Sequence, residues 1–263
     1  MLEAVVFGIL ASSALVVGGA LGSFWRPSDL VTGAMLAFAS GTLISALAFE
    51  LFPEAVELGG LRASGWGLLA GAATFVVVNA WLDSRVVPPE EVEDTELPHE
   101  LAGSVAEQHE KVAVASRGVG LALLAAVTLD GVPENLALGV SLAGEEAIGG
   151  SSLALLVAIF ASNFPEALVG AVAMRSQGRS AGYAVGLWGA TAVLLTLAVV
   201  VGRQALAAAE PSTLGFPLAF AGGAVLASLA DTLMPEAFER GRPVNAFATA
   251  AGFYVAFVLA EGW

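Results

Sequence analysis

The chain has 263 residues, of which 57% are hydrophobic and 13% are charged. Soluble domains carry about 25% charged residues, so this composition indicates a membrane protein and excludes an ordinary soluble domain. The formal net charge of −14 makes nucleic acid and anionic lipid head groups poor partners and favours a cation. No cysteine occurs, which excludes disulfides, thiolate metal sites and cysteine nucleophiles.

Breaks at Pro, Gly and charged residues divide the chain into eight apolar runs. They cover residues 2–25, 31–58, 64–87, 117–143, 148–174, 180–204, 214–239 and 243–262. A helix of about 20 apolar residues crosses a bilayer, and the short alternating segments of a β-barrel are absent from the sequence. We therefore predict an all-α, polytopic membrane protein whose eight transmembrane helices form a single domain. Glu3 stands where a cleaved signal would be basic, so the first run is interpreted as a retained helix.

Residues 88–116 form the one long polar segment, and they divide the predicted bundle into three helices plus five. Their Pro and Glu content favours a solvated, partly disordered acidic loop. The only two histidines, His99 and His109, lie in this loop, and transient metal binding there is a weaker alternative to simple solvation. The predicted membrane helices therefore contain no imidazole.

The basic residues predict the orientation, because Lys and Arg accumulate in cytoplasmic loops. With the N-terminus outside, only Arg62 and Arg203 face outward. The cytoplasmic side then receives the other eight, Arg26, Arg85, Lys111, Arg117, Arg175, Arg179, Arg240 and Arg242. Both termini are expected outside, with the acidic loop in the cytoplasm.

An internal repeat supports this arrangement. Residues 36–59 align without gaps on residues 218–241, with 13 of 24 positions identical. The copies belong to the second and seventh predicted helices, which cross the membrane in opposite directions. Inverted repeats of this kind build many secondary transporters, whose substrate sites lie at the repeat interface near mid-membrane.

The fourth and fifth predicted helices carry acids inside apolar runs, in LDGVPENLALG and SNFPEALVG. Asp130 and Glu134 are spaced i, i+4, and Asn163 and Glu166 are spaced i, i+3, so each pair shares one helix face. Facing helices would merge the two pairs into one cage of oxygen atoms. Buried carboxylates cost several kcal/mol unless they are protonated, paired or metal-bound, and no Lys or Arg lies near the centre of any run. A divalent cation would compensate them best.

Proline adds oxygen ligands to this proposed cage. Pro133 and Pro165 cannot donate to the carbonyls of Leu129 and Ala161, which are left for a ligand or water. The alternatives stay open: the prolines are merely tolerated kinks, the acids are protonated core residues, and Asn163 only bonds across helices.

Four further acids lie on the repeats and are pathway candidates. Glu50 and Asp231 sit deeper in their runs and are interpreted as entrance or exit groups. Glu54 and Glu236 fall toward the ends of their runs, where interfacial solvation is an equal alternative.

With these motifs in view, the sequence resembles the ZIP (Zrt/Irt-like protein) family of divalent metal transporters over nearly its whole length. The resemblance implies eight helices, both termini outside, a variable cytoplasmic loop after the third helix, and a metal site built on HNxPEG-like motifs of the fourth and fifth helices. It implies a plasma (inner) membrane carrier that moves metal toward the cytoplasm.

The resemblance also implies roles for single residues. Asp130 stands where the family has its fourth-helix histidine, and Glu134 matches the glutamate of that motif. On the fifth helix, Ser162 replaces a His or Gln, Asn163 matches a His, Asp or Asn, and Glu166 matches the motif glutamate.

Three departures from the family pattern change the expected metal chemistry. Gly131 replaces an asparagine associated with a second metal site, and the sixth helix, with GLWGATAVLL, lacks the glutamate of binuclear members, so a single site is expected. Asp231 stands where many members have a seventh-helix histidine. Oxygen ligands without imidazole suit Mn²⁺, Mg²⁺ or Ca²⁺ better than zinc, and Fe²⁺ is intermediate. Mn, Fe, Zn and Cd are therefore all considered as substrates, and no organic cofactor is expected.

Several alternatives to a divalent metal transporter stay open. They are a proton- or sodium-coupled carrier of another solute, a transport-deficient metal-binding homologue, and an intramembrane aspartyl protease that uses Asp130 and Asp231. The protease would need a GxGD motif, which is absent, so we expect no enzyme. The expected partners are the lipid bilayer and divalent metal ions. A homodimer is one assembly that we consider.

Overall fold

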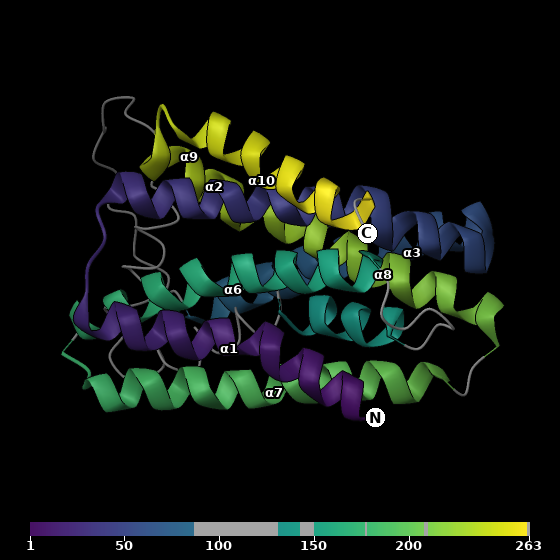
Figure 1. The fold of residues 1–263 in the computed structure, drawn as a ribbon, viewed down its shortest axis with the longest axis horizontal. Helices are drawn as coiled ribbons and strands as arrows, with labels where there is room; N and C mark the ends of the chain where they lie inside the picture. Colours follow the sequence, from purple (N-terminus) through teal and green to yellow (C-terminus); the bar gives the residue numbers. More distant parts are fainter. Residues whose placement is uncertain (87–130, 143–149, 177, 208–209, 262–263) are drawn as a thin grey trace.

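The computed structural model describes residues 1–86, 131–142, 150–176, 178–207 and 210–261. Within these ranges every regular element is a helix, which confirms the predicted all-α class. The helices lie side by side along one common direction (Figure 1). The predicted acidic loop, and residues 117–130 of the predicted fourth helix, lie outside the described residues.

The described elements are all helical and follow one another in chain order. They are α1 Leu2–Phe24, α2 Asp29–Ala46, η1 Leu47–Leu51, α3 Phe52–Val86, a helix over residues 131–141, α6 Gly150–Ser176, α7 Ala181–Ala207, α8 Pro211–Ser228, η2 Leu229–Leu233, α9 Met234–Gly241 and α10 Asn245–Glu261. The elements η1 and η2 are π-helical turns, which no pattern in the sequence predicts.

The helix boundaries have local causes. Ser28 caps α2, because its hydroxyl accepts a hydrogen bond from the Val31 amide, and Ser180 caps α7 by accepting from the Tyr183 amide at 3.1 Å. Inside α3, Gly60 adopts φ 77° and ψ 158°, which interrupts the helix. This interruption lies between the predicted runs 31–58 and 64–87.

Five helical stretches of the described residues are long and apolar enough to cross a membrane. They are Leu2–Phe24, Asp29–Trp81, Ser152–Ser176, Ala181–Gln204 and Ser212–Gly241, and the shorter Asn245–Ala260 is also apolar. The second stretch has 53 residues and contains the Gly60 interruption. A straight helix of that length would measure about 80 Å, far more than the hydrocarbon core. The structure is therefore compatible with a multi-pass membrane protein.

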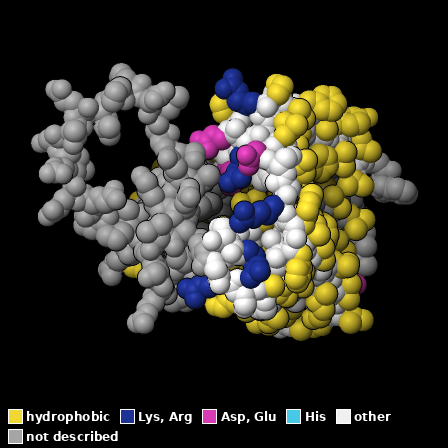
Figure 2. Space-filling model, turned by 90° about the vertical axis from the view of Figure 1, so that its left-hand side faces the viewer, with side chains coloured by type: hydrophobic (Ala, Val, Ile, Leu, Met, Phe, Trp, Pro, Cys, Tyr) yellow, Lys and Arg dark blue, Asp and Glu magenta, His cyan; other side chains and the backbone are white. Residues whose placement is uncertain are grey.

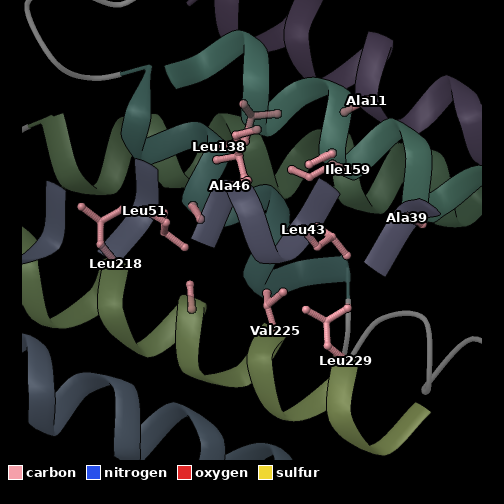
Figure 3. Packing of buried hydrophobic residues seen from close by; sticks show 14 of the residues in the cluster. Ala11, Ala39, Leu43, Ala46, Leu51, Leu138, Ile159, Leu218, Val225 and Leu229 are labelled. Atoms are coloured by element: carbon pink, nitrogen blue, oxygen red, sulfur yellow. The ribbon is translucent and has the colours of Figure 1, made fainter. Parts of the chain in front are cut away.

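The helices pack in two sets. In the first set, α1 packs against α6 and α7; in the second, α2 packs against α9 and α10, and α3 packs against α8. Contacts of α6 with α2 and α10 join the sets. Figure 3 shows part of the larger apolar core, where Leu43 and Ala46 of α2, Leu138, Ile159 of α6 and Val225 of α8 meet.

The two sequence repeats touch each other at both ends. Gly33 and Gly215 lie three residues before their repeats, whereas Gly59 and Gly241 end them. A Cβ added at Gly33 would lie 2.1 Å from the Gly241 nitrogen, and one added at Gly59 would lie 2.7 Å from the Gly215 Cα. The start of each repeat therefore lies beside the end of the other, and only glycine fits at these crossings.

Candidate functional site

The helix over residues 131–141 and helix α6 form a hairpin that carries the described site residues. The Ser141 and Ser152 hydroxyl oxygens lie 3.4 Å apart, and both residues flank the short connection between the helices. The two helices therefore leave this contact in the same spatial direction, with antiparallel chain directions.

This contact sets the depth of each site residue. Glu134 lies seven residues before Ser141, which is about 10 Å along the helix. On α6, Ser162 and Asn163 lie about 15 Å along the helix beyond Ser152. Their depth below the serine contact therefore differs from that of Glu134 by about one helical turn. Glu166 lies about one further helical turn along α6, away from the Ser152 contact.

The same residues are withdrawn from the surface. Glu134 is 7% exposed, Asn163 is 1% exposed and Ser162 is fully buried, whereas Glu166 is half-buried. Both glutamates take part in interactions within the protein. Asp130, the remaining predicted ligand, lies outside the described residues. Counted from the contact of Ser141 with Ser152, Glu134, Ser162 and Asn163 lie at about the same depth, and Glu166 lies farther along.

The polar partners of these residues show which atoms remain for a ligand. The Ser162 hydroxyl donates to the Ile159 carbonyl at 3.1 Å, so its oxygen lone pairs are not used by that bond. The Asn163 amide nitrogen donates to the Ala11 carbonyl of α1 at 3.4 Å. Asn163 therefore forms a hydrogen bond between two helices, which is one of the alternatives predicted for it. This bond leaves the amide oxygen able to accept a hydrogen bond or to bind a metal ion.

Asn135 is a polar core residue that was not among the predicted site residues. It is fully buried, and its amide nitrogen donates to the Gly131 carbonyl at 2.8 Å, while its amide oxygen has no hydrogen-bond partner among the described residues. It shares a helix face with Gly131 and Gly139, which pack on Leu195 and Val199 of α7. A buried oxygen without a partner costs about 1 to 3 kcal/mol, so this position suits a water or a cation. The sequence feature that could have identified Asn135 is its place directly after the Pro-Glu pair of the motif.

The two π-helical turns occupy equivalent positions of the two repeats. In η1 the Phe52 amide donates to the Leu47 carbonyl, and in η2 the Met234 amide donates to the Leu229 carbonyl. A proline follows each turn, and proline has no amide hydrogen. The carbonyls of Ala48 and Ala230 therefore have no partner within their own helices. Such turns inside α-helices occur frequently at functional sites.

The predicted pathway acids Glu50 and Asp231 lie on these turns. Glu50 is half-buried, and Asp231 is exposed and accepts a hydrogen bond from the Asn79 side chain of α3 at 2.8 Å. Each π-helical turn thus combines one carboxylate with one carbonyl that lacks a helix partner. Asn79 is a second polar residue that was not predicted, although an amide near the end of an apolar run was visible in the sequence.

The other two pathway candidates differ from each other. Glu54 is half-buried on α3. Its counterpart Glu236 is 7% exposed and lies 3.0 Å from Arg240, whose guanidinium also donates to Asp29 of α2 at 3.2 Å. Glu236 is therefore held in an ion pair rather than solvated at an interface.

Among the described residues, no group of three or more His, Asp or Glu side chains could hold a metal ion. A cation at the hairpin would therefore need amide, hydroxyl or carbonyl oxygens beside the two glutamates.

No protein-family model matches the chain, and no curated protein matches it.

Proposed function

We propose that this protein is a divalent metal transporter of the ZIP type, which carries its substrate through an oxygen-lined site on the fourth and fifth helices. The observation that carries the proposal is the burial of Glu134 at the depth of Ser162 and Asn163 on a helix hairpin inside an apolar bundle. A carboxylate in such a place requires a proton, a partner or a cation, and a divalent cation would supply charge to both glutamates of the hairpin.

The proposed architecture has eight membrane helices and inverted repeats, with both termini outside the plasma membrane. The crossings of Gly33 with Gly241 and of Gly59 with Gly215 support it, because exchanging the two repeats turns one contact into the other. The equivalent π-helical turns support it as well. Inverted repeats with interrupted helices at the substrate pathway are common in secondary transporters.

The substrate is a divalent cation with a preference for oxygen ligands. Glu134 and Glu166 supply charge, while Ser162, Asn163 and the unpartnered oxygen of Asn135 supply neutral oxygens. Asp130 is proposed as the third carboxylate. This ligand set favours Mn²⁺ or Fe²⁺ over Zn²⁺ and Cd²⁺, which prefer imidazole or thiolate.

Transport follows from movement of the first helix set against the second. The hairpin belongs with α1 and α7, because Asn163 bonds to α1 and the glycines of residues 131–139 pack on α7. The second set carries Glu50 and Asp231 on its π-helical turns. Rocking of the first set would move the metal between outward and inward access, with these acids lining the approach.

Metal uptake by proteoliposomes tests this proposal. The purified chain should accumulate Mn²⁺ or Fe²⁺ in competition with Zn²⁺, Cd²⁺, Co²⁺ and Mg²⁺. Glu134→Gln and Glu166→Gln keep the size of the side chain but remove one charge, so each should weaken metal binding at least about tenfold, or about 1.4 kcal/mol. Asp130→His should move the preference toward zinc.

Glu239→Gln is the matched control, because Glu239 is exposed near the end of α9 and the substitution removes the same charge. This control should transport like the wild type. Uptake of no divalent metal by the wild type, with intact folding, would contradict metal transport. Unchanged binding in both glutamate variants would move the site away from the hairpin, with Glu50 and Asp231 as the next candidates.

A further inference from the structure

Arginine side chains gather at one end of the helical bundle. We define the arginine surface as Arg26, Arg175, Arg179, Arg240 and Arg242. These residues lie beside the ends of α1, α6 and α9 and the start of α7. Figure 2, which faces this end, shows Lys and Arg side chains grouped on it beside a wall of hydrophobic side chains.

Packing brings these separate chain segments to the same end. Gly22 near the end of α1 packs on the Leu168 carbonyl, and Gly18 packs on the Phe164 carbonyl, so α1 and α6 run in parallel toward the same end of the bundle. Gly33 near the start of α2 packs on Gly241 at the end of α9. The Arg175 guanidinium donates to the Arg179 carbonyl, which joins α6 to the start of α7.

Most of these charges are not neutralised within the described protein. Arg240 is paired with Glu236 and Asp29. The other four, Arg26, Arg175, Arg179 and Arg242, form no ion pair with any described carboxylate. At the opposite end, Arg203 pairs with Glu3 at 2.7 Å, which leaves Arg62 as the unpaired arginine described there.

Aromatic rings accompany the unpaired arginines. The Arg179 guanidinium lies 5.2 Å from the centre of the Tyr183 ring, and that of Arg242 lies 4.5 Å from the centre of the Phe238 ring. Trp25, which is 45% exposed, precedes Arg26. Aromatic and basic side chains at the ends of apolar helices are typical of the head-group level of a bilayer.

We propose that the arginine surface binds the phosphate groups of anionic phospholipids in the leaflet that contacts this end of the bundle. The net charge of −14 does not prevent this, because charges more than about 8 to 10 Å away are screened at physiological salt. Four guanidinium groups that form no ion pair with a described carboxylate supply a local positive field at this end of the bundle, and arginine binds phosphate in a forked geometry. The inference rests on the membrane location and is independent of metal transport.

Native mass spectrometry of the full chain in detergent, mixed with equal amounts of phosphatidylglycerol and phosphatidylcholine, tests this inference. The wild type should retain phosphatidylglycerol preferentially. A basic residue near an anionic surface contributes about fivefold, so Arg179→Gln and Arg242→Gln should each lower the preference about two- to fivefold. Replacing all four unpaired arginines by glutamine should lower it more than about tenfold. High salt should weaken the preference, whereas soluble glycerol phosphate should not displace the lipid at equal concentration.

Arg62→Gln is the matched control at the opposite end, and it should leave the preference unchanged. Circular dichroism identifies variants that remain folded, and the single substitutions keep the test valid if the fourfold variant unfolds. Equal retention of both lipids by the wild type, or an equal loss in the Arg62→Gln control, would overturn the proposal. It would also be overturned if the preference appeared only after deletion of residues 91–110, because the acidic segment would then be the occupant.

Discussion

The buried acids of this protein have different electrostatic partners. Glu236 lies within 3.0 Å of Arg240, and Arg240 reaches Asp29 on another helix. Its repeat counterpart Glu54 has Leu58 where Glu236 has Arg240, so this arginine pair exists in one repeat only. Glu236 therefore pairs within α9 with Arg240, and Arg240 in turn links α9 to α2. Glu134 is equally withdrawn from solvent, at 7% exposure, on the helix over residues 131–141.

Removal of Arg240 should show how this ion pair stabilises the fold. Arg240→Gln leaves Glu236 buried without its cation, and a partly exposed pair of this kind should lose about 1 to 3 kcal/mol of unfolding free energy. The double variant Glu236→Gln with Arg240→Gln should recover part of that loss, because no unpaired charge remains. Thermal unfolding in detergent measures both changes. Additive losses in the double variant would contradict a direct pair.

Part of the candidate site followed from residue patterns, and part did not. The acids of the two Pro-Glu motifs stand out in an apolar run, and Glu134 is indeed buried. Asn135 and Asn79 were missed, because an amide is ordinary in sequence and only its partners reveal its role. Asn79 reaches Asp231 across 152 positions of the chain, a separation that no local pattern encodes.

At the scale of elements, glycines decide how closely the helices pack. A Cβ added at Gly71 of α3 would lie 1.9 Å from the Phe220 carbonyl oxygen of α8, and one added at Gly252 of α10 would lie 2.0 Å from that of Phe38 in α2. Phe38 and Phe220 are repeat counterparts, so both repeats use the same crossing. Small residues permit such approaches in membranes, where packing replaces the hydrophobic effect between helices.

Gly71→Ala should therefore push α3 away from α8. The added methyl group meets backbone atoms that cannot rotate away, so the unfolding free energy should fall by about 1 to 3 kcal/mol. Gly186→Ala in α7 is the control, because no atom lies within 4 Å of its added Cβ. This variant should be neutral or slightly more stable. Equal midpoints of thermal unfolding for the two variants would show that the α3 and α8 contact is not tight.

At the scale of the whole molecule, positive charge is distributed unequally between the two ends of the helical bundle. Four arginines without an ion pair to any described carboxylate lie at one end, whereas Arg62 and the pair of Arg203 with Glu3 lie at the other. Basic residues stay on the cytoplasmic side of membrane proteins, so the arginine surface should face the cytoplasm. The start of α1 and the end of α10 lie away from the arginine surface (Figure 1), so this orientation would put both chain termini outside.

Cysteine labelling tests this orientation on a background without native cysteine. Leu61→Cys should react with an impermeant thiol reagent applied outside, because Leu61 is 70% exposed beside the Gly60 interruption. Ser176→Cys, at the exposed end of α6, should react only after permeabilisation. Cysteine is avoided at Gly60 itself, since its positive φ strains other residues. The reverse labelling pattern would contradict the proposed topology.

The sequence by itself determined the all-helical class, the apolar stretches, the repeat and the acids on the Pro-Glu helices, because composition and short-range spacing encode these properties directly. The tertiary structure decided the π-helical turns, the burial of Asn135, the pair of Glu236 with Arg240 and the grouping of arginines at one end. These features depend on contacts such as that of Asp29 with Arg240, whose partners are 211 positions apart. Only the packing of the helices against one another brings such residues together.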